Sequence, residues 1–179
     1  MTIVNQTSFG LAGVNIYETS IDQKFALGAR TRVTWGDDKD KSAEVVYIKC
    51  LAASLNAGYL CELPLISGTD AYKIDKYLTI AIATTECGAV GGQIAACAPC
   101  TNMLVGECGW AFVSGVISLF IGASAAAKQK LYATTTSGLC DDTPTAIIVA
   151  GVTPISANGG ANAKIDAFAS GDIHVERLP

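Results

Sequence analysis

Charge is scarce in this chain. Its 179 residues include 12 basic and 16 acidic side chains, so charged residues make up 16%, against about 25% in an average soluble domain. No cluster of lysines or arginines occurs, and the formal net charge is -4, which removes the electrostatic basis for tight binding to a phosphate backbone. We therefore expect no nucleic-acid partner. Hydrophobic residues make up 50% of the chain and can offset the entropy cost of ordering, which argues against intrinsic disorder.

The first residues lack the features of a secretory signal. Residues 1–6 carry neither the basic nor the apolar stretch of a signal peptide, and the number of cysteines, seven, is odd. We therefore expect a protein that is made and kept in a reducing cytoplasm. The cysteines stand among alanine, valine and glycine, which favours small buried side chains over a disulfide framework. They are Cys50, Cys61, Cys87, Cys97, Cys100, Cys108 and Cys140.

Charge is absent from one long run, Cys108–Ala127. The run reaches the length of a membrane-spanning helix, roughly 20 residues. Glycine and serine interrupt it, however, and no asymmetry of lysine and arginine frames it. Its apolar side chains also alternate, with Trp110 and Phe112 in one row and Val113 and Ile117 in the other. This pattern predicts a strand that is buried on both faces, and we expect no membrane segment.

Short β-prone runs separated by turn residues fill most of the chain, a spacing typical of an all-β protein. The clearest signal is a hairpin, with strands at 30–35 and 44–50 and a charged tip at 36–41. We expect one compact β-rich domain at residues 25–179, sandwich-like or barrel-like, after an extended N-terminal arm at residues 1–24 that needs a partner for its packing. Further strands are expected at 59–63, 77–83, 110–121, 130–135 with a hairpin return at 139–140, 146–152 and 163–175, and short helical turns at Ser54–Ala57 and Ala123–Lys128.

The cysteines offer two candidate chemistries. Cys97-Ala98-Pro99-Cys100 matches the CxPC pattern of disulfide oxidoreductases, in which a helix N-terminus lowers the pKa of the first thiol. The residues that follow are too β-prone for the long helix that this mechanism needs. Together with Cys87 and Cys108 the motif supplies four thiols for a structural zinc ion, but zinc ribbons have two CxxC knuckles and this chain has one. Redox chemistry and metal binding are therefore the weaker alternatives.

The other candidates for chemistry favour structural roles. His174 is the one histidine, and it lies in a β-like segment without a nucleophile-elbow motif. Asp37–Asp38 and Asp141–Asp142 could serve as paired carboxylates, but their turn-like context predicts solvated loop tips. The glycine-rich pieces at 88–92 and 158–160 lack the lysine and hydroxyl residue of a phosphate loop and predict turns. We therefore predict no catalytic, cofactor-binding or metal-ligating residue, and no enzyme.

The order of several short motifs resembles a known family. The chain is similar to the small head decoration (cement) proteins of tailed bacteriophages over residues 25–153. It is richer in cysteine than that family, and this departure leaves the strand pairing around Cys87 to Asn102 open. In the first half the matching segments are residues 25–30, 45–49 and 55–58. In the second half they are Gly106-Glu107-Cys108-Gly109-Trp110-Ala111-Phe112-Val113-Ser114-Gly115, Lys130-Leu131-Tyr132-Ala133-Thr134, Ser137-Gly138 and Ile148-Val149-Ala150-Gly151-Val152.

The resemblance implies an all-β virion protein without enzyme activity. Such a protein is made in the host cytoplasm, binds the outer surface of an icosahedral head as a dimer or trimer, and stabilises contacts between subunits of the major capsid protein. We expect residues 81–153 to form the packed body and the contacts between copies, and residues 1–24 to reach onto the shell. The alternative is another structural virion component, such as a tail or host-attachment protein, because the same charge-poor, β-rich composition serves those roles.

Overall fold

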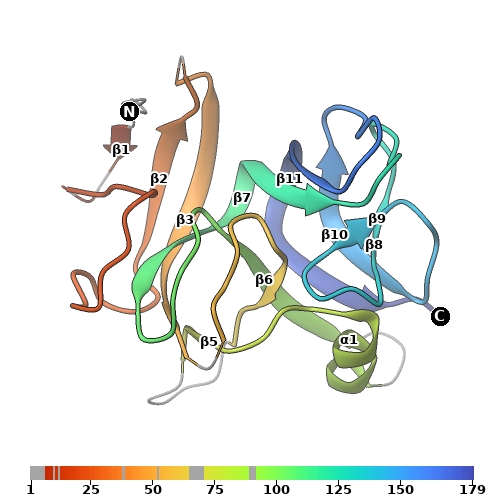
Figure 1. Ribbon diagram of the computed structural model, residues 1–179, viewed down its shortest axis with the longest axis horizontal. Coiled ribbons are helices and arrows are strands. Elements are labelled where there is room, and N and C mark those ends of the chain that lie inside the picture. Colours follow the sequence, from red (N-terminus) through yellow and green to blue (C-terminus); the bar gives the residue numbers. More distant parts are fainter. Residues whose placement is uncertain are drawn as a thin grey trace.

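The computed structural model describes residues 7–9, 11, 13–37, 39–51, 53–64, 71–88 and 92–179. These residues form eleven strands and one helix, which confirms the all-β prediction. Figure 1 shows their arrangement, with the N-terminal strands on one side and the C-terminal strands on the other. In chain order the elements are β1 Thr7–Phe9, β2 Arg30–Trp35, β3 Lys41–Cys50, β4 Cys61–Glu62, β5 Lys73–Ile74, α1 Ile80–Cys87, β6 Gln93–Pro99, β7 Cys108–Ile121, β8 Leu131–Ala133, β9 Cys140–Asp141, β10 Ile147–Pro154 and β11 Ala163–Arg177.

Five strands in the second half of the chain close into a ring. Strand β7 pairs antiparallel with β11, β11 with β10, β10 with β8, and β8 with β9. Strand β9 then returns to β7 in parallel, where Cys140 lies opposite Ile121. We call β7, β8, β9, β10 and β11 the ring. Because each of its strands has two neighbours, the ring is barrel-like, and it leaves few backbone groups unpaired.

The hairpin predicted at the start of the domain is confirmed. Strands β2 and β3 pair antiparallel from Arg30 opposite Val46 to Trp35 opposite Lys41. Strand β3 begins three residues earlier than expected, so that only the short segment 36–40 forms the tip. The other edge of β3 pairs with the first half of β7. The hairpin therefore continues the same sheet that builds the ring.

Gly115 is the point at which β7 changes partners. Residues of β7 before it pair with β3 and residues after it pair with β11, while Gly115 itself lies opposite both Ala43 and Ala169. Its φ is +86°, and a Cβ atom here would lie 2.4 Å from the carbonyl oxygen of Ser42. Only glycine fits such a position without strain, because it has no Cβ and accepts positive φ. The long strand can bend between the hairpin and the ring at this residue.

The core has two parts, one on each face of β7. The larger cluster contains Trp110 and Phe112 together with buried residues of the hairpin and the ring. The smaller cluster contains Ala111 and Val113. Residues Cys108–Val113 are all buried and alternate ones enter different clusters, so burial on both faces is confirmed for this half of β7. After Gly115 one face is buried and the other is half-buried. The smaller cluster consists of Val46, Ile48, Cys50, Leu55, Cys61, Leu63, Ile74, Cys97, Met103, Ala111 and Val113.

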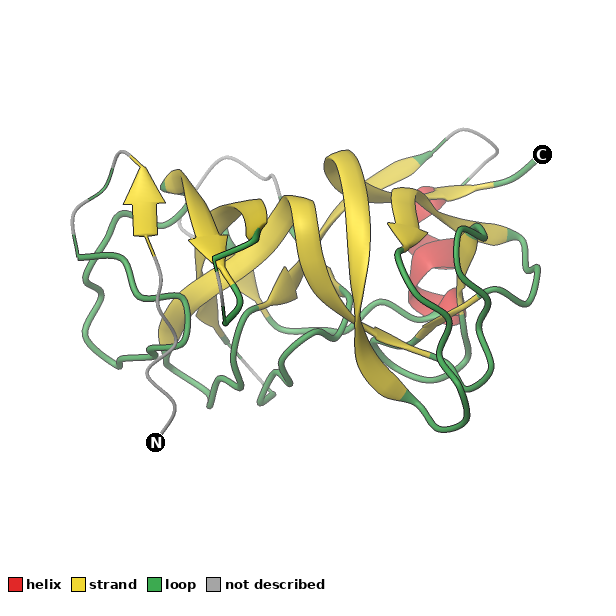
Figure 2. Cartoon of the chain, turned by 90° about the horizontal axis from the view of Figure 1, so that it is seen from above, coloured by secondary structure: helices red, strands yellow, loops and turns green. Residues whose placement is uncertain are grey.

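The strand expected at 77–83 is wrong, because the chain forms helix α1 there (Figure 2). Thr79 has extended backbone angles and its hydroxyl accepts the N–H of Ile82 at 3.3 Å, as an N-cap does. The hydroxyls of Thr84 and Thr85 donate to carbonyls one turn earlier, at 2.6 and 3.0 Å. These β-branched residues favour a strand by propensity alone, and the tertiary context overrides that preference.

Both short helical turns expected from the sequence are also wrong. Ser54–Ala57 is extended around Leu55, which exchanges backbone hydrogen bonds with Met103 at 2.8 Å. Ala123–Lys128 forms two short turns, in which the N–H groups of Ala123, Ala126 and Lys128 bond to other segments and that of Ala125 bonds to Gly122 at 3.4 Å. For example, Ala123 donates to the side chain of Asn162 at 2.9 Å. These segments bond to distant partners, which a local pattern does not reveal.

The structure also settles the segment that the sequence left open. Strand β6 forms there and pairs with β4, β7 and β11. The strand expected at 59–63 is confirmed only as the two-residue β4. The strand expected at 146–152 is β10, which continues to Pro154 instead of ending before it. In the described part of the chain, no helix is long and apolar enough to cross a membrane.

The described part of the predicted N-terminal arm packs on its own chain. Ile16 is completely buried in the larger cluster. Ser20 exchanges two backbone hydrogen bonds with Cys108, at 3.0 and 2.7 Å, and the N–H of Lys24 donates to the hydroxyl of Tyr47 at 3.3 Å. Strand β1 pairs with the outer edge of β2. The arm's residues 1–6, 10 and 12 lie outside the described residues.

Candidate interaction surface

The CxPC motif lies at the end of a strand and not at the start of a helix. Cys97 belongs to β6 and Cys100 follows it directly after the strand. Both side chains are buried, but Cys97 enters the smaller core cluster and Cys100 the larger one. Burial raises the pKa of both thiols well above the ordinary value. A reactive thiol needs the opposite shift, so the environment does not activate this motif.

The four cysteines considered for zinc are not brought together. Cys87 ends α1, where its thiol lies 3.5 Å from the carbonyl oxygen of Val175. Cys108 begins β7, next to the segment that contains Ser20. All seven cysteines are buried thiols outside any disulfide, and the described residues include no group of three or more His, Cys, Asp or Glu that could hold a metal ion. The thiols therefore act as core side chains in this structure.

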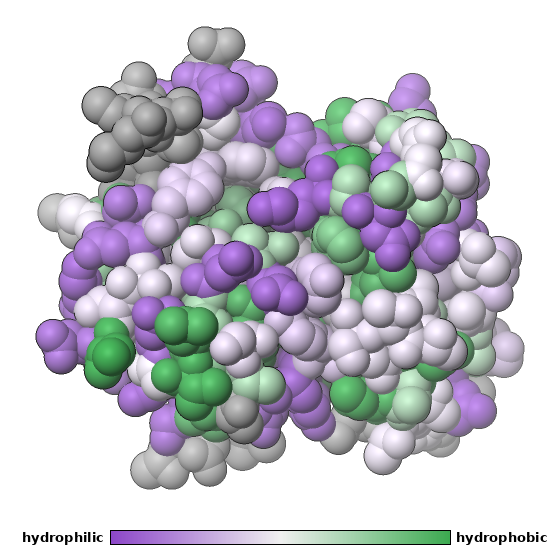
Figure 3. All heavy atoms as spheres, viewed as in Figure 1, coloured by the Kyte–Doolittle hydropathy of each residue, from purple (hydrophilic) through white to green (hydrophobic). Residues whose placement is uncertain are grey.

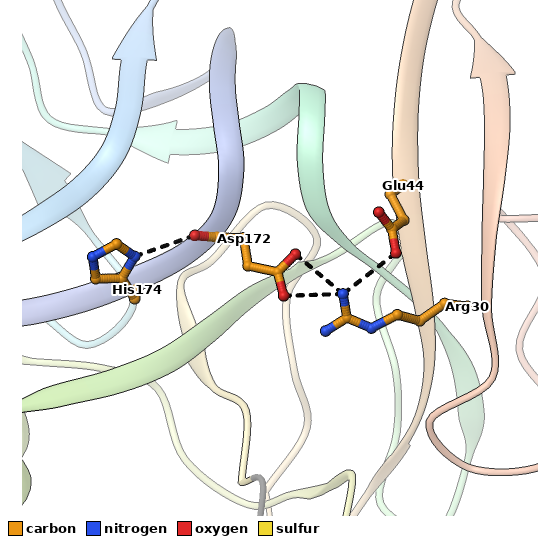
Figure 4. Close-up of polar contacts among 4 residues, drawn as sticks. All are labelled: Arg30, Glu44, Asp172 and His174. Carbon is orange, nitrogen blue, oxygen red and sulfur yellow. Dashed lines mark hydrogen bonds and ion pairs between the residues drawn. The ribbon is translucent and has the colours of Figure 1, made fainter.

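His174 lies beside a cluster of ion pairs that joins the hairpin to β11 (Figure 4). Arg30 of β2 contacts the carboxylate of Asp172 at 3.1 and 3.0 Å and that of Glu44 at 3.3 Å. The Nδ1 atom of His174 lies 3.2 Å from the carbonyl oxygen of Asp172, and its Nε2 lies 4.0 Å from Glu176. The histidine is half-buried on a strand, as predicted. Among the described residues, its hydrogen-bond and ion-pair contacts involve no serine or cysteine.

The acidic pairs hold turns. Asp142 accepts the N–H of Ala126 at 2.9 Å, and Asp141 accepts the N–H of Asp142 at 2.7 Å. Asp141 lies in β9 and is half-buried, so the expected loop tip is wrong for this residue. Burial raises the pKa of Asp141, and the carboxylate of Asp142 raises it further, while the backbone N–H of Asp142 opposes this shift. Asp37 is exposed at the hairpin tip, and Asp38 lies outside the described residues.

The glycine-rich pieces open no phosphate-binding helix. Gly88 follows the end of α1 with a φ of +57°, and residues 89–91 lie outside the described part. In the other piece, Gly159 and Gly160 are exposed in the loop between β10 and β11, as expected. Asn158 beside them is buried, and its side-chain amide donates to the carbonyls of Ile121 and Gly122, each at 2.9 Å.

Large hydrophobic side chains are exposed where β3 ends and β7 begins. Ile21 is 76% exposed, Leu104 63%, Val105 53% and Leu51 36%. Backbone hydrogen bonds bring their segments together, because Cys50 exchanges bonds with Gly106 and Glu107, and Ser20 does so with Cys108. Figure 3 shows a group of strongly hydrophobic side chains at this end of the molecule, on the lower left. We call Ile21, Leu51, Leu104 and Val105 the apolar patch.

The turn that carries Leu104 and Val105 is held firmly. Glu107 accepts the N–H of Leu104 through its side chain at 2.7 Å, and its own N–H donates to the carbonyl of Leu104 at 3.0 Å. Gly106 supplies the positive φ, +90°, that closes the turn. The two exposed apolar side chains therefore lie on a turn that backbone and side-chain hydrogen bonds hold in place. The signal for this pair in the sequence is an apolar dipeptide directly before Gly106.

A groove separates the hairpin from the ring, with a volume of about 390 Å³. Arg32 and Glu44 line the hairpin side, Phe168 and Ser170 line the β11 side, and Gly115 lies between them. Phe168 is 50% exposed. The groove is open and is lined by both polar and apolar residues, whereas the patch is apolar, so the two surfaces suit different contacts.

No protein-family model, curated protein or solved structure matches this chain. The assignment of a function therefore rests on the residues and their geometry.

Proposed function

We propose that this chain is a capsid decoration protein that binds the outer surface of a phage head and stabilises contacts between subunits of the major capsid protein. The apolar patch is the observation that supports the proposal most, since it offers exposed hydrophobic side chains on a backbone that needs no rearrangement to bind. The motif similarity over residues 25–153 supports the same class of partner. The exposed pair Leu104–Val105 lies within that region.

The patch suits a weak contact that is repeated many times. Its side chains come from three separate segments, which the hydrogen bonds of Cys50 and Ser20 fix in place, so little conformational entropy is lost on binding. A small apolar contact gives modest affinity by itself, about 25 cal/mol for each Å² buried. A decoration protein that associates with itself as a dimer or trimer presents several copies of the patch to the shell, and the copies add through avidity.

Neither of the motifs considered for catalysis is activated in the described part of the chain, which agrees with a binding role. Burial raises the pKa of the CxPC thiols, and the ion pairs beside His174 connect strands. The closed ring forms a stiff body for transmitting force between the subunits it contacts. Ile21 of the patch lies in the segment 1–24, and we propose the other exposed side chains of that segment as a second contact with the shell.

Co-sedimentation with empty heads tests the proposal. The double variant Leu104→Asp with Val105→Asp should reduce binding at least tenfold, because the substitutions place charge in the contact. Ile155→Asp is the matched control, since Ile155 is also apolar and 48% exposed but lies after β10, outside the patch. Sedimentation velocity on all three proteins shows whether they fold and associate alike.

The outcomes separate the candidate roles. Equal head binding by the patch variant and the control would contradict the role of the patch, and absence of binding by the wild-type protein would contradict decoration itself. Binding to tails instead of heads would favour the alternative of a tail or host-attachment protein. A deletion of residues 1–6 tests the arm separately. Deletion of all 24 residues would not do so, because it removes Ile16 from the core.

A further inference from the structure

Cys61 and Cys97 are direct cross-strand partners. Strands β4 and β6 pair antiparallel with Cys61 opposite Cys97. The N–H of Leu63 donates to the carbonyl of Ala95 at 2.8 Å, two residues further along the same register. In an antiparallel ladder this makes Cys61 and Cys97 a hydrogen-bonded pair as well, with Cα atoms about 5.5 Å apart. That Cα separation is in the range of known disulfides, about 4.4–6.8 Å. The Cβ atoms of a hydrogen-bonded pair are about 5.5 Å apart, so they must approach by about 1 Å to reach the disulfide range of about 3.5–4.5 Å.

The two side chains face the same way. Directly opposed residues of an antiparallel pair project from the same face of the sheet, and both cysteines belong to the smaller core cluster and are completely buried. Each is a free thiol in this structure. Within the described residues, no other two cysteines are opposed by strand register.

Cys50 is a third thiol of the same cluster, but its position differs. It lies at the end of β3, and its thiol donates to the carbonyl of Ala53 at 3.0 Å. Its register partner is Ile74 of β5. Cys100 is close in sequence to Cys97 but belongs to the larger cluster. Register therefore favours Cys61 as the partner of Cys97 over both neighbours.

We propose that Cys61 and Cys97 form a disulfide bond when the folded protein meets a small oxidant such as hydrogen peroxide. One thiol sulfur attacks the peroxide, the O–O bond breaks, and a sulfenic acid and one water molecule form. The second thiol then attacks the sulfenic sulfur, the S–S bond forms, and a second water molecule leaves. In total, two thiols lose two hydrogens and one peroxide is reduced to two waters.

The bond would tie the edge of the sheet to its interior. Strand β4 has two residues and pairs with β6. On its other side Cys61 bridges to Tyr77, and the adjacent Leu60 bonds to Leu78 and Gly138. The linkage would enclose the segment between Cys61 and Cys97, which includes α1. Closing such a loop restricts the unfolded chain and thereby stabilises the folded one. In a reducing cytoplasm the pair would stay as thiols, and the bond would form after release into oxidising surroundings.

Burial controls the rate of this reaction. It raises the pKa of both thiols, and the thiolate is the reactive form. Oxidation should therefore be slow at neutral pH and faster at alkaline pH. Access for the oxidant requires local opening of β4, which a short edge strand undergoes more readily than the core.

Peptide mapping of the full chain tests the proposal. The native protein is treated with hydrogen peroxide, its remaining thiols are alkylated, and a non-reducing digest is analysed by mass spectrometry. We expect a peptide that joins Cys61 to Cys97, and a rise in Tm of about 5–10 °C that dithiothreitol reverses. Cys97→Ala should abolish both changes, whereas the matched control Cys140→Ala, which alters a buried thiol of the ring, should retain them.

Two results would overturn the proposal. One is a cross-link that joins Cys97 to Cys100 or Cys50 to Cys61 in its place. The other is the complete absence of an internal cross-link in folded wild-type protein, which does not depend on whether a variant folds. The reaction is a property of the chain alone, so its outcome is independent of whether the protein binds phage heads.

Discussion

The β2–β3 hairpin and the ring bury their surfaces by different means. Each strand of the ring has a neighbour on both sides, and β7, β8 and β10 contain no charged residue. The hairpin carries charges along both strands and at its tip, and it joins the ring through the pairing of β3 with β7. The comparison indicates that closure stabilises the ring, whereas attachment to β7 and contacts across the groove hold the hairpin in place.

Side chains add specific links between the two regions. The indole N–H of Trp35 donates to the carbonyl of Val116 at 2.8 Å. Lys41 lies 4.7 Å from the centre of the Trp35 ring and forms an ion pair with Asp166 at 2.8 Å. Arg30 forms the corresponding link to Asp172 further along β11. These contacts join the hairpin and the ring near Gly115, where the shared strand β7 bends. Substitutions can test the bend, the buried side chains and the ion pairs separately.

The largest effect is expected at Gly115. Gly115→Ala would place a Cβ atom 2.4 Å from the carbonyl oxygen of Ser42 at a φ of +86°, so that both a clash and backbone strain oppose folding. We expect a loss of about 3–5 kcal/mol in the free energy of unfolding, measured with urea. Gly159→Ala is the control, because nothing lies within 4 Å of its Cβ position. Equal stability of the two variants would contradict the requirement for glycine at the position where β7 bends.

Next in size is Ile16→Ala, which tests whether the N-terminal segment belongs to the core. Ile16 is completely buried, and removal of a buried isoleucine side chain costs about 2–5 kcal/mol. Ile21→Ala should change stability by less than about 0.5 kcal/mol, since Ile21 is exposed in the apolar patch. Thermal and urea unfolding of both variants measure the difference, and a small loss for Ile16→Ala would place this segment outside the cooperative unit.

Asn158→Ala should weaken the ring by a smaller amount. The buried side-chain amide donates to the carbonyls of Ile121 and Gly122, and loss of a buried partner costs about 1–3 kcal/mol. Asn162→Ala serves as a comparison, because its exposed side chain accepts one hydrogen bond, from Ala123. Urea unfolding should show the larger loss for Asn158→Ala, and the reverse order would refute the role assigned to its burial.

The ion pair across the groove is expected to contribute little. The side chains of Arg30 and Asp172 are 31% and 57% exposed, so solvent screens their interaction and we expect less than about 1 kcal/mol. A double-mutant cycle with Arg30→Gln and Asp172→Asn measures the coupling, which should shrink at high salt. A coupling energy that does not change with salt would contradict the expectation that solvent screens this ion pair.

The smallest effect is expected in the pH dependence of stability, through Asp141 in strand β9 of the ring. Burial raises the pKa of Asp141 above its value in the unfolded chain, so the folded state binds this proton more tightly. Stability should therefore fall as the pH rises through the interval between the two values. Asp141→Asn keeps an oxygen for the N–H of Asp142 and removes the titration. Unfolding measured between acidic and neutral pH should show a flatter profile for this variant, and an unchanged profile would contradict the assignment.

The parts of the fold that the sequence predicted are those with strong local patterns. The hairpin has a charged tip between two β-prone runs, and β7 shows two interleaved apolar rows, so both were predicted with nearly correct bounds. Helix α1 was missed because Ile80, Thr84 and Thr85 favour strands by propensity, while its N-cap Thr79 gives a weak signal. Strand β6 was missed because alanine, cysteine and a terminal proline do not resemble a strand.

The candidate surface was harder to predict than the fold. Leu104 and Val105 are ordinary core-type residues in the sequence, and their exposure depends on a turn held by Glu107 and on contacts with Cys50. The reverse holds for Asn158, a typical loop residue that the structure buries. The alignment of Cys61 with Cys97 follows from strand register, which two distant segments acquire only when they pair.

The position of β11 in chain order has a consequence for how the protein folds. The ring closes when β11 pairs with β7 and β10, and β11 follows every other strand. During synthesis, β7 and β10 therefore emerge from the ribosome before the strand that covers their edges. Folding through such distant pairings is slow and leaves strand edges open to other chains for a time. A host chaperone, or rapid completion of synthesis, would raise the yield of the folded protein without any change in its final stability.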